Sequence, residues 1–397
     1  MVISMNIQPS FRRSRRMESM EISEIVRISE RAGEMRREGH DIVSFGTGEP
    51  DFPTPVHVIE AAHSAAKAGQ TRYTPTAGTA ELRGEIAASY GLATNNVIVS
   101  TGAKQVLASA MMATLDPGDE VIIPTPYWTT YSDIVRMCEG KPVTIQCPMA
   151  VGFKLSPEAL ERAITPRTRW LMLNSPSNPS GAVYSAEEFR ALAEVLDRYP
   201  HVWIISDEIY EHLSYGPCVS FAAENPALRD RTLIVNGVSK AWSMTGWRIG
   251  WGVGPQPLIA AMASVQGQIT SGACSIAQAA ALAAITGDKA LLDERRENLR
   301  ARRDRVVTIV NTMAGLQCPS PDGAFYVFPS CAALLSDAGG RFKSDADFCA
   351  WLLDVAGVAI VPGRAFGLPG HVRMSFAYSD AELSKGLTRI GEALERI

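Results

Sequence analysis

The sequence lacks the features that mark several large classes of protein. Its seven cysteines are an odd number without a Cys-x-x-Cys pair, and no Cys/His cluster has the spacing of a zinc site. We therefore expect no metal centre, free thiols and a cytoplasmic location, where thiols stay reduced. The least interrupted apolar stretch, residues 273–285, is shorter than the ~20 residues that a membrane span requires.

The sequence also has no excess of basic residues. Its formal net charge is -4, whereas a dedicated nucleic-acid binder is usually basic. Hydrophobic residues make up 46% and charged residues 20% of the chain, which is typical of a folded globular protein. Because single cores stop growing at roughly 250–300 residues, the length of 397 residues predicts more than one domain.

Short apolar runs alternate with helical patterns through the first two thirds of the chain. Runs without polar alternation indicate strands that are buried on both faces. We predict such strands at residues 97–100, 120–123, 169–173, 202–206 and 232–235, and helices at residues 103–115 and 186–199. Strands and helices in this order predict an α/β fold with a doubly wound, mostly parallel sheet.

A second, smaller α/β unit is predicted after residue 287. It contains strands at residues 324–328, 358–361 and 372–376 and helices at residues 345–356 and 380–396. A charged helix over residues 288–313 is expected to bridge the two units, with its arginines on a solvated face. We therefore divide the chain into an N-terminal arm with part of the small domain (1–50), a large domain (51–290) and a small C-terminal domain (291–397).

Several polar residues follow the predicted strands, at the edge where open parallel sheets bind ligands. Thr101-Gly102-Ala103-Lys104 opens a helix, and free N–H groups there attract an anion. Asp207 ends an apolar strand, where a carboxylate is costly without a cation or donors. Lys240 follows another strand, where lost hydration favours a neutral, nucleophilic amine. Each has a structural alternative: a helix cap for the Thr-Gly turn and for Asp207, and a surface position for the lysine.

The set as a whole fits one ligand, pyridoxal 5′-phosphate (PLP). Its phosphate needs a helix N-terminus and an arginine, for which Arg248 is available, and its aldehyde needs a lysine. Its ring nitrogen needs a carboxylate so that the ring acts as an electron sink. Its 3′-oxygen needs donors, and Asn178 and Tyr210 lie at the same predicted sheet edge.

Seven motifs spread over almost the whole chain resemble those of a known family. They are Gly48-Glu49-Pro50-Asp51-Phe52, Tyr73-Thr74-Pro75-Thr76-Ala77-Gly78, Pro126-Tyr127-Trp128, Asn178-Pro179-Ser180-Gly181, Ser206-Asp207-Glu208-Ile209-Tyr210, Ser239-Lys240 with Met244-Thr245-Gly246-Trp247-Arg248, and Val372-Arg373-Met374-Ser375. On these motifs the chain resembles the fold-type I PLP enzymes of the class I and II aminotransferases, in particular the bacterial aspartate/aromatic aminotransferase subgroup.

The resemblance implies a role for each residue of the site. Lys240 would form the Schiff base with the cofactor and carry the α-proton, and Asp207 would pair with the ring nitrogen. The remaining cofactor contacts would come from Gly102, Ala103, Lys104 and Arg248 at the phosphate, Asn178 and Tyr210 at the 3′-oxygen, and Trp128 on the ring face. The substrate would contact Gly48, Trp128, Asn178 and Arg373, whose guanidinium would clamp the α-carboxylate. Tyr73 would reach the phosphate of a neighbouring subunit, which implies a homodimer with shared active sites.

The implied activity is the transfer of an amino group between an L-amino acid and a 2-oxo acid by a ping-pong mechanism. Relatives that accept dicarboxylates have a Lys and a Thr where this chain has Glu21 and Ile25, so an aromatic, neutral or basic substrate is an alternative to aspartate. Arg364 offers a cation that would favour a dicarboxylate. A lyase of the same fold is a second alternative. A non-catalytic PLP-binding regulatory module is a remote one, because no basic helix-turn-helix segment precedes residue 46.

Overall fold

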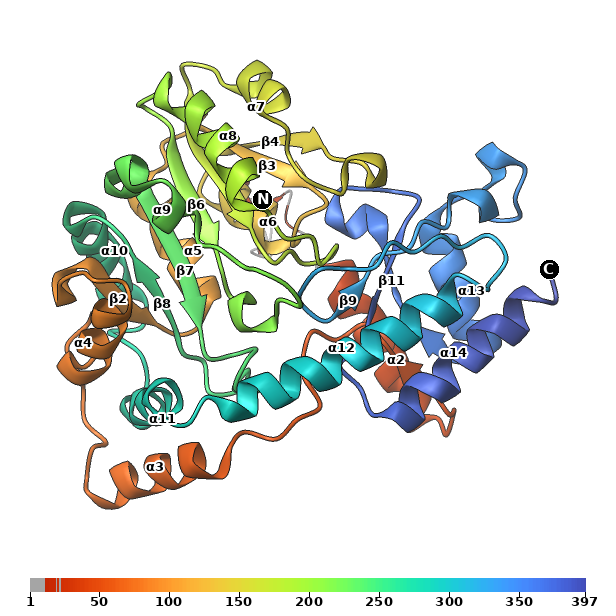
Figure 1. Ribbon diagram of the computed structural model, residues 1–397, viewed down its shortest axis with the longest axis horizontal. Coiled ribbons are helices and arrows are strands. Elements are labelled where there is room, and N and C mark those ends of the chain that lie inside the picture. Colours follow the sequence, from red (N-terminus) through yellow and green to blue (C-terminus); the bar gives the residue numbers. More distant parts are fainter. Residues whose placement is uncertain (1–10, 19, 21–22) are drawn as a thin grey trace, which may run out of the picture.

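The computed structural model describes residues 11–18, 20 and 23–397. Its centre is a seven-stranded sheet in the order β2-β8-β7-β6-β5-β3-β4. β8 is antiparallel to both of its neighbours and the other pairs are parallel, which confirms the predicted α/β fold with a mostly parallel sheet (Figure 1). The strands are β2 (Val97–Ser100), β3 (Glu120–Thr125), β4 (Lys141–Gln146), β5 (Thr168–Asn174), β6 (Trp203–Asp207), β7 (Thr232–Gly237) and β8 (Gly250–Val253).

Helices cover both faces of this sheet because alternate strand residues point to opposite sides. In β5, Trp170 and Met172 pack in one hydrophobic cluster, whereas Leu171 and Leu173 pack in another. The first cluster includes side chains of α5 (Ala103–Thr114), α6 (Thr130–Met137) and α10 (Gln256–Ile269), and the second those of α7 (Pro157–Ala163) and α8 (Ala186–Asp197). A third cluster joins β2 and β8 to α3 (Val56–Lys67), α4 (Ala80–Ser89) and α11 (Ser275–Thr286).

Two small sheets form a second unit. β1 (Val43–Ser44) pairs in parallel with β10 (Val358–Ala359), and β11 (Val361–Pro362), β12 (Val372–Ser375) and β9 (Tyr326–Val327) form an antiparallel sheet. α13 (Asp345–Ala356) and α14 (Asp380–Leu394) pack over them, and α2 (Glu24–Arg37) joins the same unit through Ala32 and Met35. The strands of these sheets lie before residue 50 or after residue 290. The domain boundaries themselves stay a prediction.

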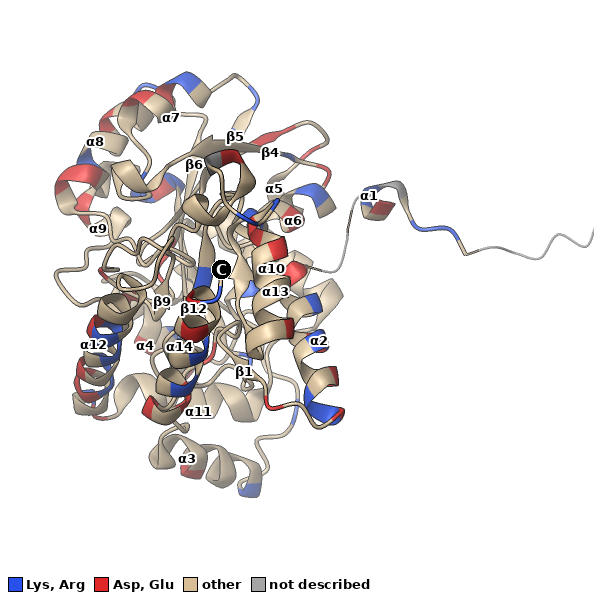
Figure 2. Cartoon of the chain, turned by 90° about the vertical axis from the view of Figure 1, so that its right-hand side faces the viewer, with Lys and Arg blue, Asp and Glu red and all other residues tan. Residues whose placement is uncertain are grey.

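The long helix α12 (Ala290–Val310) runs from the large sheet to the small unit (Figure 1). Basic and acidic residues both occur along α12, α14 and α2 (Figure 2). The prediction of a solvated arginine face on α12 is nevertheless wrong for several side chains, among them Arg295, Arg302 and Arg303. Arg302 is only 8% exposed and Arg295 is half-buried, because both reach the segment at residues 51–53.

The sequence pattern does not predict β4 and β8. β4 is an edge strand with half-exposed and exposed residues, so it has no buried apolar run. β8 contains Gly250, where a Cβ atom would lie 2.3 Å from the backbone nitrogen of Ala103. Glycine therefore lets the first turn of α5 approach the sheet closely. The single strand predicted at 358–361 is also wrong, because Ile360 separates β10 from β11 and these pair with different partners.

The remaining short helices are α1 (Arg15–Glu18) and α9 (Phe221–Glu224). In the part of the chain that the structure describes, no helix is long and apolar enough to cross a membrane. Within the same residues, no group of three or more His, Cys, Asp and Glu side chains could hold a metal ion.

Candidate active site

A cavity of about 340 Å³ opens at the carboxyl ends of β5, β6 and β7. This is the edge at which the sequence predicts a ligand site. The predicted residues that line the cavity are Gly48, Ala103, Lys104, Trp128, Asn178, Asp207, Tyr210, Lys240, Arg248 and Arg373. Side chains that were not predicted also line it, among them Glu49, Tyr131, Asn174, Ser239, Thr245 and Tyr326. Both units of the fold therefore contribute to one site.

Lys240 follows β7 and is a half-buried residue in the wall of the cavity. The Nζ atom donates a hydrogen bond of 2.6 Å to the backbone oxygen of Gly48, which comes from the N-terminal segment. Burial lowers the pKa of Lys240 to about 8, because the charged form loses its hydration. A substantial fraction of the amine is therefore neutral near pH 8, as a nucleophile or a base requires.

Asp207 is the last residue of β6 and is only 2% exposed. Its Oδ2 accepts a hydrogen bond of 2.7 Å from the hydroxyl of Tyr131, and its Oδ1 accepts one of 3.2 Å from the backbone N–H of Ile209. Burial raises the pKa of Asp207 to about 6 in spite of these donors. The Asp207 side chain caps neither the 3-10 turn that follows β6 nor another described helix, so the helix-cap alternative does not explain this carboxylate. A carboxylate held in this way suits a ligand with a positively charged group.

Arg373 lies on β12 with 2% of its surface exposed. Its Nη1 donates to the Oδ1 of Asn178 at 2.9 Å, and its Nη2 donates to the backbone oxygen of Gly46 at 2.6 Å. Its guanidinium also lies over the rings of Tyr326 and Phe366, at 4.5 and 4.9 Å. The buried Nε has no hydrogen-bond partner among the described residues. A buried guanidinium with a spare donor and no carboxylate partner is a site for an anion.

The start of α5 forms a positively charged end of the cavity. Gly102 has a φ of 82°, and a Cβ atom at this position would lie 2.4 Å from Nη2 of Arg248. Glycine thus allows the Arg248 guanidinium to approach the free N–H groups of the helix. The Nζ of Lys104 lies 4.9 Å from the centre of the Trp128 ring. In the described part of the chain, no carboxylate lies within ion-pair distance of this ammonium, and burial lowers its pKa.

Two tyrosines that the sequence did not predict hold the predicted side chains in place. Tyr131 comes from α6 and binds Asp207, while its ring meets that of Trp128 edge to face at 5.7 Å. Tyr326 comes from β9, and its hydroxyl lies 3.0 Å from that of Tyr210. Both belong to elements other than those that carry their partners. The local sequence around Asp207 and Tyr210 therefore does not predict that Tyr131 and Tyr326 contact them.

Four predicted residues lie outside the cavity or outside the described residues. Gly102 does not line the cavity, although its neighbour Ala103 does. Tyr73 is 94% exposed and borders a separate surface hollow with residues 71–74 and 270–275. Glu21 lies outside the described residues, whereas Ile25 lines the cavity. Arg364 does not line it, because its guanidinium forms an ion pair with Glu24. The suggestion that Arg364 offers a free cation to the substrate is therefore wrong for this arrangement.

The residues that are present fit PLP. The start of α5 and Arg248 offer a place for a phosphate, and the buried carboxyl of Asp207 suits a protonated ring nitrogen. Lys240 supplies an amine with a lowered pKa at the same cavity. The unpartnered Nε of Arg373 leaves a donor for a carboxylate.

The chain matches the family model described as aminotransferase class I and II over residues 40–390. It is 53% identical to an aspartate aminotransferase of Rhizobium meliloti strain 1021, with 98% of each chain covered. It is 47% identical to an aspartate/prephenate aminotransferase of Cereibacter sphaeroides, with 93% of this chain and 95% of the other covered.

Two solved structures match the fold closely. The crystal structure of an aspartate aminotransferase from Rhizobium meliloti gives a TM-score of 0.94 at 54% identity and covers 98% of this chain and 100% of the other. The aspartate aminotransferase from Thermus thermophilus with maleate gives 0.91 at 41% identity, with 97% and 100% covered. This chain therefore belongs to the class I and II aminotransferases, enzymes that use PLP to transfer an amino group between an amino acid and a 2-oxo acid.

Proposed function

We propose that this enzyme takes aspartate as its amino donor. A dicarboxylic amino acid has two carboxylates. Four cationic side chains line the cavity, and no described carboxylate forms an ion pair with them. Lys240 is assigned to the base and Arg248 to the phosphate, which leaves Arg373 and Lys104 for the two carboxylates of the substrate. This pair of cations is the observation that carries the proposal. The names of the relatives support it, since they are aspartate and aspartate/prephenate aminotransferases.

Arg373 is the proposed partner of the α-carboxylate. Its Nη1 and Nη2 are held by Asn178 and Gly46, which fixes the plane of the guanidinium. Its Nε keeps a free donor, and the side-chain amide of Asn178 can add a second contact. Lys104 is the proposed partner of the distal carboxylate. Its ammonium is partly desolvated over Trp128, which strengthens an ion pair with the substrate.

Lys240 is the proposed base that moves the α-proton. When bound, PLP supplies the electron sink that makes this proton acidic. The Nζ of Lys240 is neutral for a large fraction of the time because burial lowers its pKa to about 8, so it can take a proton and return it. Asp207, held by Tyr131, is proposed to keep the ring nitrogen protonated. Tyr210 is proposed to donate to the 3′-oxygen, with Tyr326 fixing its hydroxyl.

We further propose a homodimer in which Tyr73 completes the site of the partner subunit. The side chain is 94% exposed and borders a hollow away from its own cavity, which suits a contact to a second copy. We also propose that the enzyme works in the cytoplasm. The seven cysteines are free thiols, as a reducing compartment requires.

A half-reaction screen tests the donor. The PLP-loaded enzyme is mixed with each amino acid in turn, and the loss of the cofactor's absorbance is followed together with the release of 2-oxo acid. Aspartate and glutamate should react fastest. Faster reaction of an aromatic or basic amino acid would contradict the proposal, and continuous release of 2-oxo acid without an acceptor would indicate a lyase.

Prephenate is a second candidate, as acceptor. It carries a ring and a second carboxylate, and the cavity offers both the apolar Ile25 and the Lys104 ammonium. The same screen, run with the aminated enzyme and different 2-oxo acids, tests it. Reaction with oxaloacetate but not with prephenate would restrict the enzyme to small dicarboxylates.

A further inference from the structure

Two segments of the chain meet at the Lys240 amine. One is residues 48–54, which connects the N-terminal part of the chain to α3, and the other is residues 240–248, which follows β7. Polar contacts join them along their length, between Lys240 Nζ and Gly48 O (2.6 Å), Thr245 Oγ1 and Glu49 Oε1 (2.8 Å), Thr54 Oγ1 and Ser243 O (2.8 Å), and Trp247 Nε1 and Thr54 Oγ1 (3.1 Å). The depth of burial of Lys240 depends on how tightly these segments hold together.

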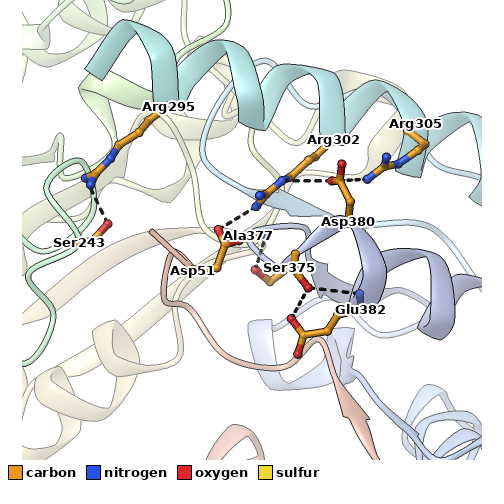
Figure 3. A network of polar contacts seen from close by, with 10 residues as sticks. Asp51, Ser243, Arg295, Arg302, Arg305, Ser375, Ala377, Asp380 and Glu382 are labelled. Atoms are coloured by element: carbon orange, nitrogen blue, oxygen red, sulfur yellow. Dashed lines mark hydrogen bonds and ion pairs between the residues drawn. The ribbon is translucent and has the colours of Figure 1, made fainter. Parts of the chain in front are cut away.

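Arg295, on α12, contacts both segments from the outside. Its Nη1 donates to the backbone oxygen of Ala241 at 2.9 Å. The same atom donates to Ser243 Oγ at 3.3 Å (Figure 3). Its Nη2 donates to the backbone oxygen of Pro53 at 2.6 Å. The planar guanidinium thus ties a residue next to Lys240 to the segment that carries the Gly48 acceptor.

The Phe52 ring completes this contact. Arg295 lies 5.2 Å from the ring centre. Arg302, about two turns further along the same face of α12, lies 5.3 Å from it. Arg302 in turn donates a hydrogen bond of 2.7 Å to Asp51. Asp380 forms ion pairs with both Arg302 and Arg305 (Figure 3). The segment at residues 51–53 is therefore held against α12 by cation–π contacts as well as hydrogen bonds.

The backbone beside Lys240 also needs this support. Ser243 has a φ of 53°, a left-handed conformation that costs energy for a residue with a side chain. Its N–H donates to the backbone oxygen of Lys240 at 3.3 Å, so this turn sets the direction in which the lysine leaves the chain. The contacts of Arg295 to Ala241 and Ser243 bind this turn in place.

We propose that Arg295 is a positioning residue for the Lys240 amine, acting through Ala241 and Ser243 on one side and Pro53 on the other. It does not line the cavity. The proposal rests on the role of Lys240 as the base. The charged side chains that line the cavity around Lys240 are Glu49, Lys104, Asp207, Arg248 and Arg373, whereas Arg295 contacts the backbone behind the lysine. Its effect is therefore one of geometry and burial.

The test compares Arg295→Met, Arg295→Lys and the control Arg300→Met. Arg300 lies on the same helix, is exposed and pairs only one turn away with Glu297. Three quantities are measured: kcat and KM with the amino donor, the pH dependence of Lys240 acetylation in the cofactor-free protein by peptide mass spectrometry, and Tm. We expect Arg295→Met to lower kcat by about 10–100-fold with KM changed by less than about 3-fold. The acetylation midpoint of Lys240 should move toward the ordinary pKa of lysine as water enters.

Arg295→Lys should recover part of kcat and of the acetylation midpoint, because an ammonium can keep one of the contacts. Arg295→Lys also provides the test of the proposal if Arg295→Met does not fold. An unchanged kcat and midpoint per folded molecule, with only Tm lowered, would overturn the proposal, as would equal losses in Arg300→Met. If the wild type reacts with no amino acid, the proposed function fails instead, and the acetylation profile still reports on Arg295.

Discussion

Tyr131 donates a hydrogen bond of 2.7 Å to the Oδ2 of Asp207, and both side chains are buried. The tyrosine comes from α6 and the aspartate from the end of β6, so two separate elements fix the carboxylate beneath the cavity. This contact keeps an anion ready at a place where burial alone would favour the neutral acid.

Tyr131→Phe should make cofactor binding more sensitive to acid. The wild-type carboxyl has a pKa of about 6, so affinity for PLP should weaken as the pH falls through about 6 and Asp207 becomes neutral. Loss of the Tyr131 donor destabilises the ionised form, which raises this pKa and moves the loss of affinity to higher pH. Titration of the cofactor-free protein with PLP between pH 5 and 8 measures the shift. Tyr199→Phe, at a half-exposed hydroxyl, is the control, and superimposable profiles for Tyr131→Phe and wild type would refute the assignment.

Asp207→Asn should raise the stability of the cofactor-free protein at pH 8 and lower the activity of the enzyme. The folded pKa of about 6 lies above the ordinary value of 3.8, so ionising this buried group costs stability as the pH rises through that range. The amide removes this cost, and we expect the cofactor-free variant to have a higher Tm than wild type at pH 8 but not at pH 4. Activity should fall by about 100–1000-fold because the ring nitrogen loses its anionic partner. A lower Tm at pH 8 would mean that Asp207 stabilises the empty fold.

Lys104→Met should change the choice of substrate and leave the general chemistry intact. The ammonium over Trp128 is proposed to bind the distal carboxylate, so kcat/KM for aspartate should fall by about 10–100-fold. The value for alanine, which has no second carboxylate, should change by less than about 3-fold if the phosphate is held mainly by α5 and Arg248. Lys67→Met, at the exposed end of α3, is the matched control. Equal losses for both substrates would assign Lys104 to the cofactor instead.

Hybrid dimers test the role of Tyr73. Lys240→Ala and Tyr73→Ala subunits are each expected to have little activity alone. If Tyr73 serves the partner's site, a mixed dimer has one site with an intact Lys240 from one subunit and an intact Tyr73 from the other. Refolding the two variants together should then restore activity, up to half of the wild-type value per mixed dimer. No recovery, with mixed dimers verified by mass, would show that Tyr73 acts within its own subunit or not at all.

Most of the large sheet and ten of the eighteen residues that line the cavity could be predicted, because their signals are local in the sequence. The run at residues 202–206 ends directly before Asp207, and the run at residues 232–235 ends five residues before Lys240. Parallel strands bring such ends together at one edge of the sheet. β8 could not be predicted because close packing against α5 requires Gly250, and glycine removes the apolar pattern. The roles of the individual site residues rest on the resemblance and on the geometry, and the experiments above test them.

The missed contacts join elements that are far apart in the chain. Tyr326 reaches Tyr210 from the small unit, and Arg295 reaches Ala241 from a helix whose composition suggests a solvated surface. The sequence leaves Arg364 open as a free cation, but its pairing with Glu24 depends on how α2 packs near the turn after β11. Composition and periodicity contain no information on such pairings, which the tertiary fold alone decides.

The most direct test of the central claim is a single-turnover half-reaction of the PLP-loaded enzyme with aspartate. We predict one equivalent of 2-oxo acid per site from the wild type, with no further release until a 2-oxo acid acceptor is added, and at least a ~1000-fold slower reaction from Lys240→Ala. Formation of 2-oxo acid at the wild-type rate by Lys240→Ala would contradict the claim that the amine of Lys240 moves the α-proton.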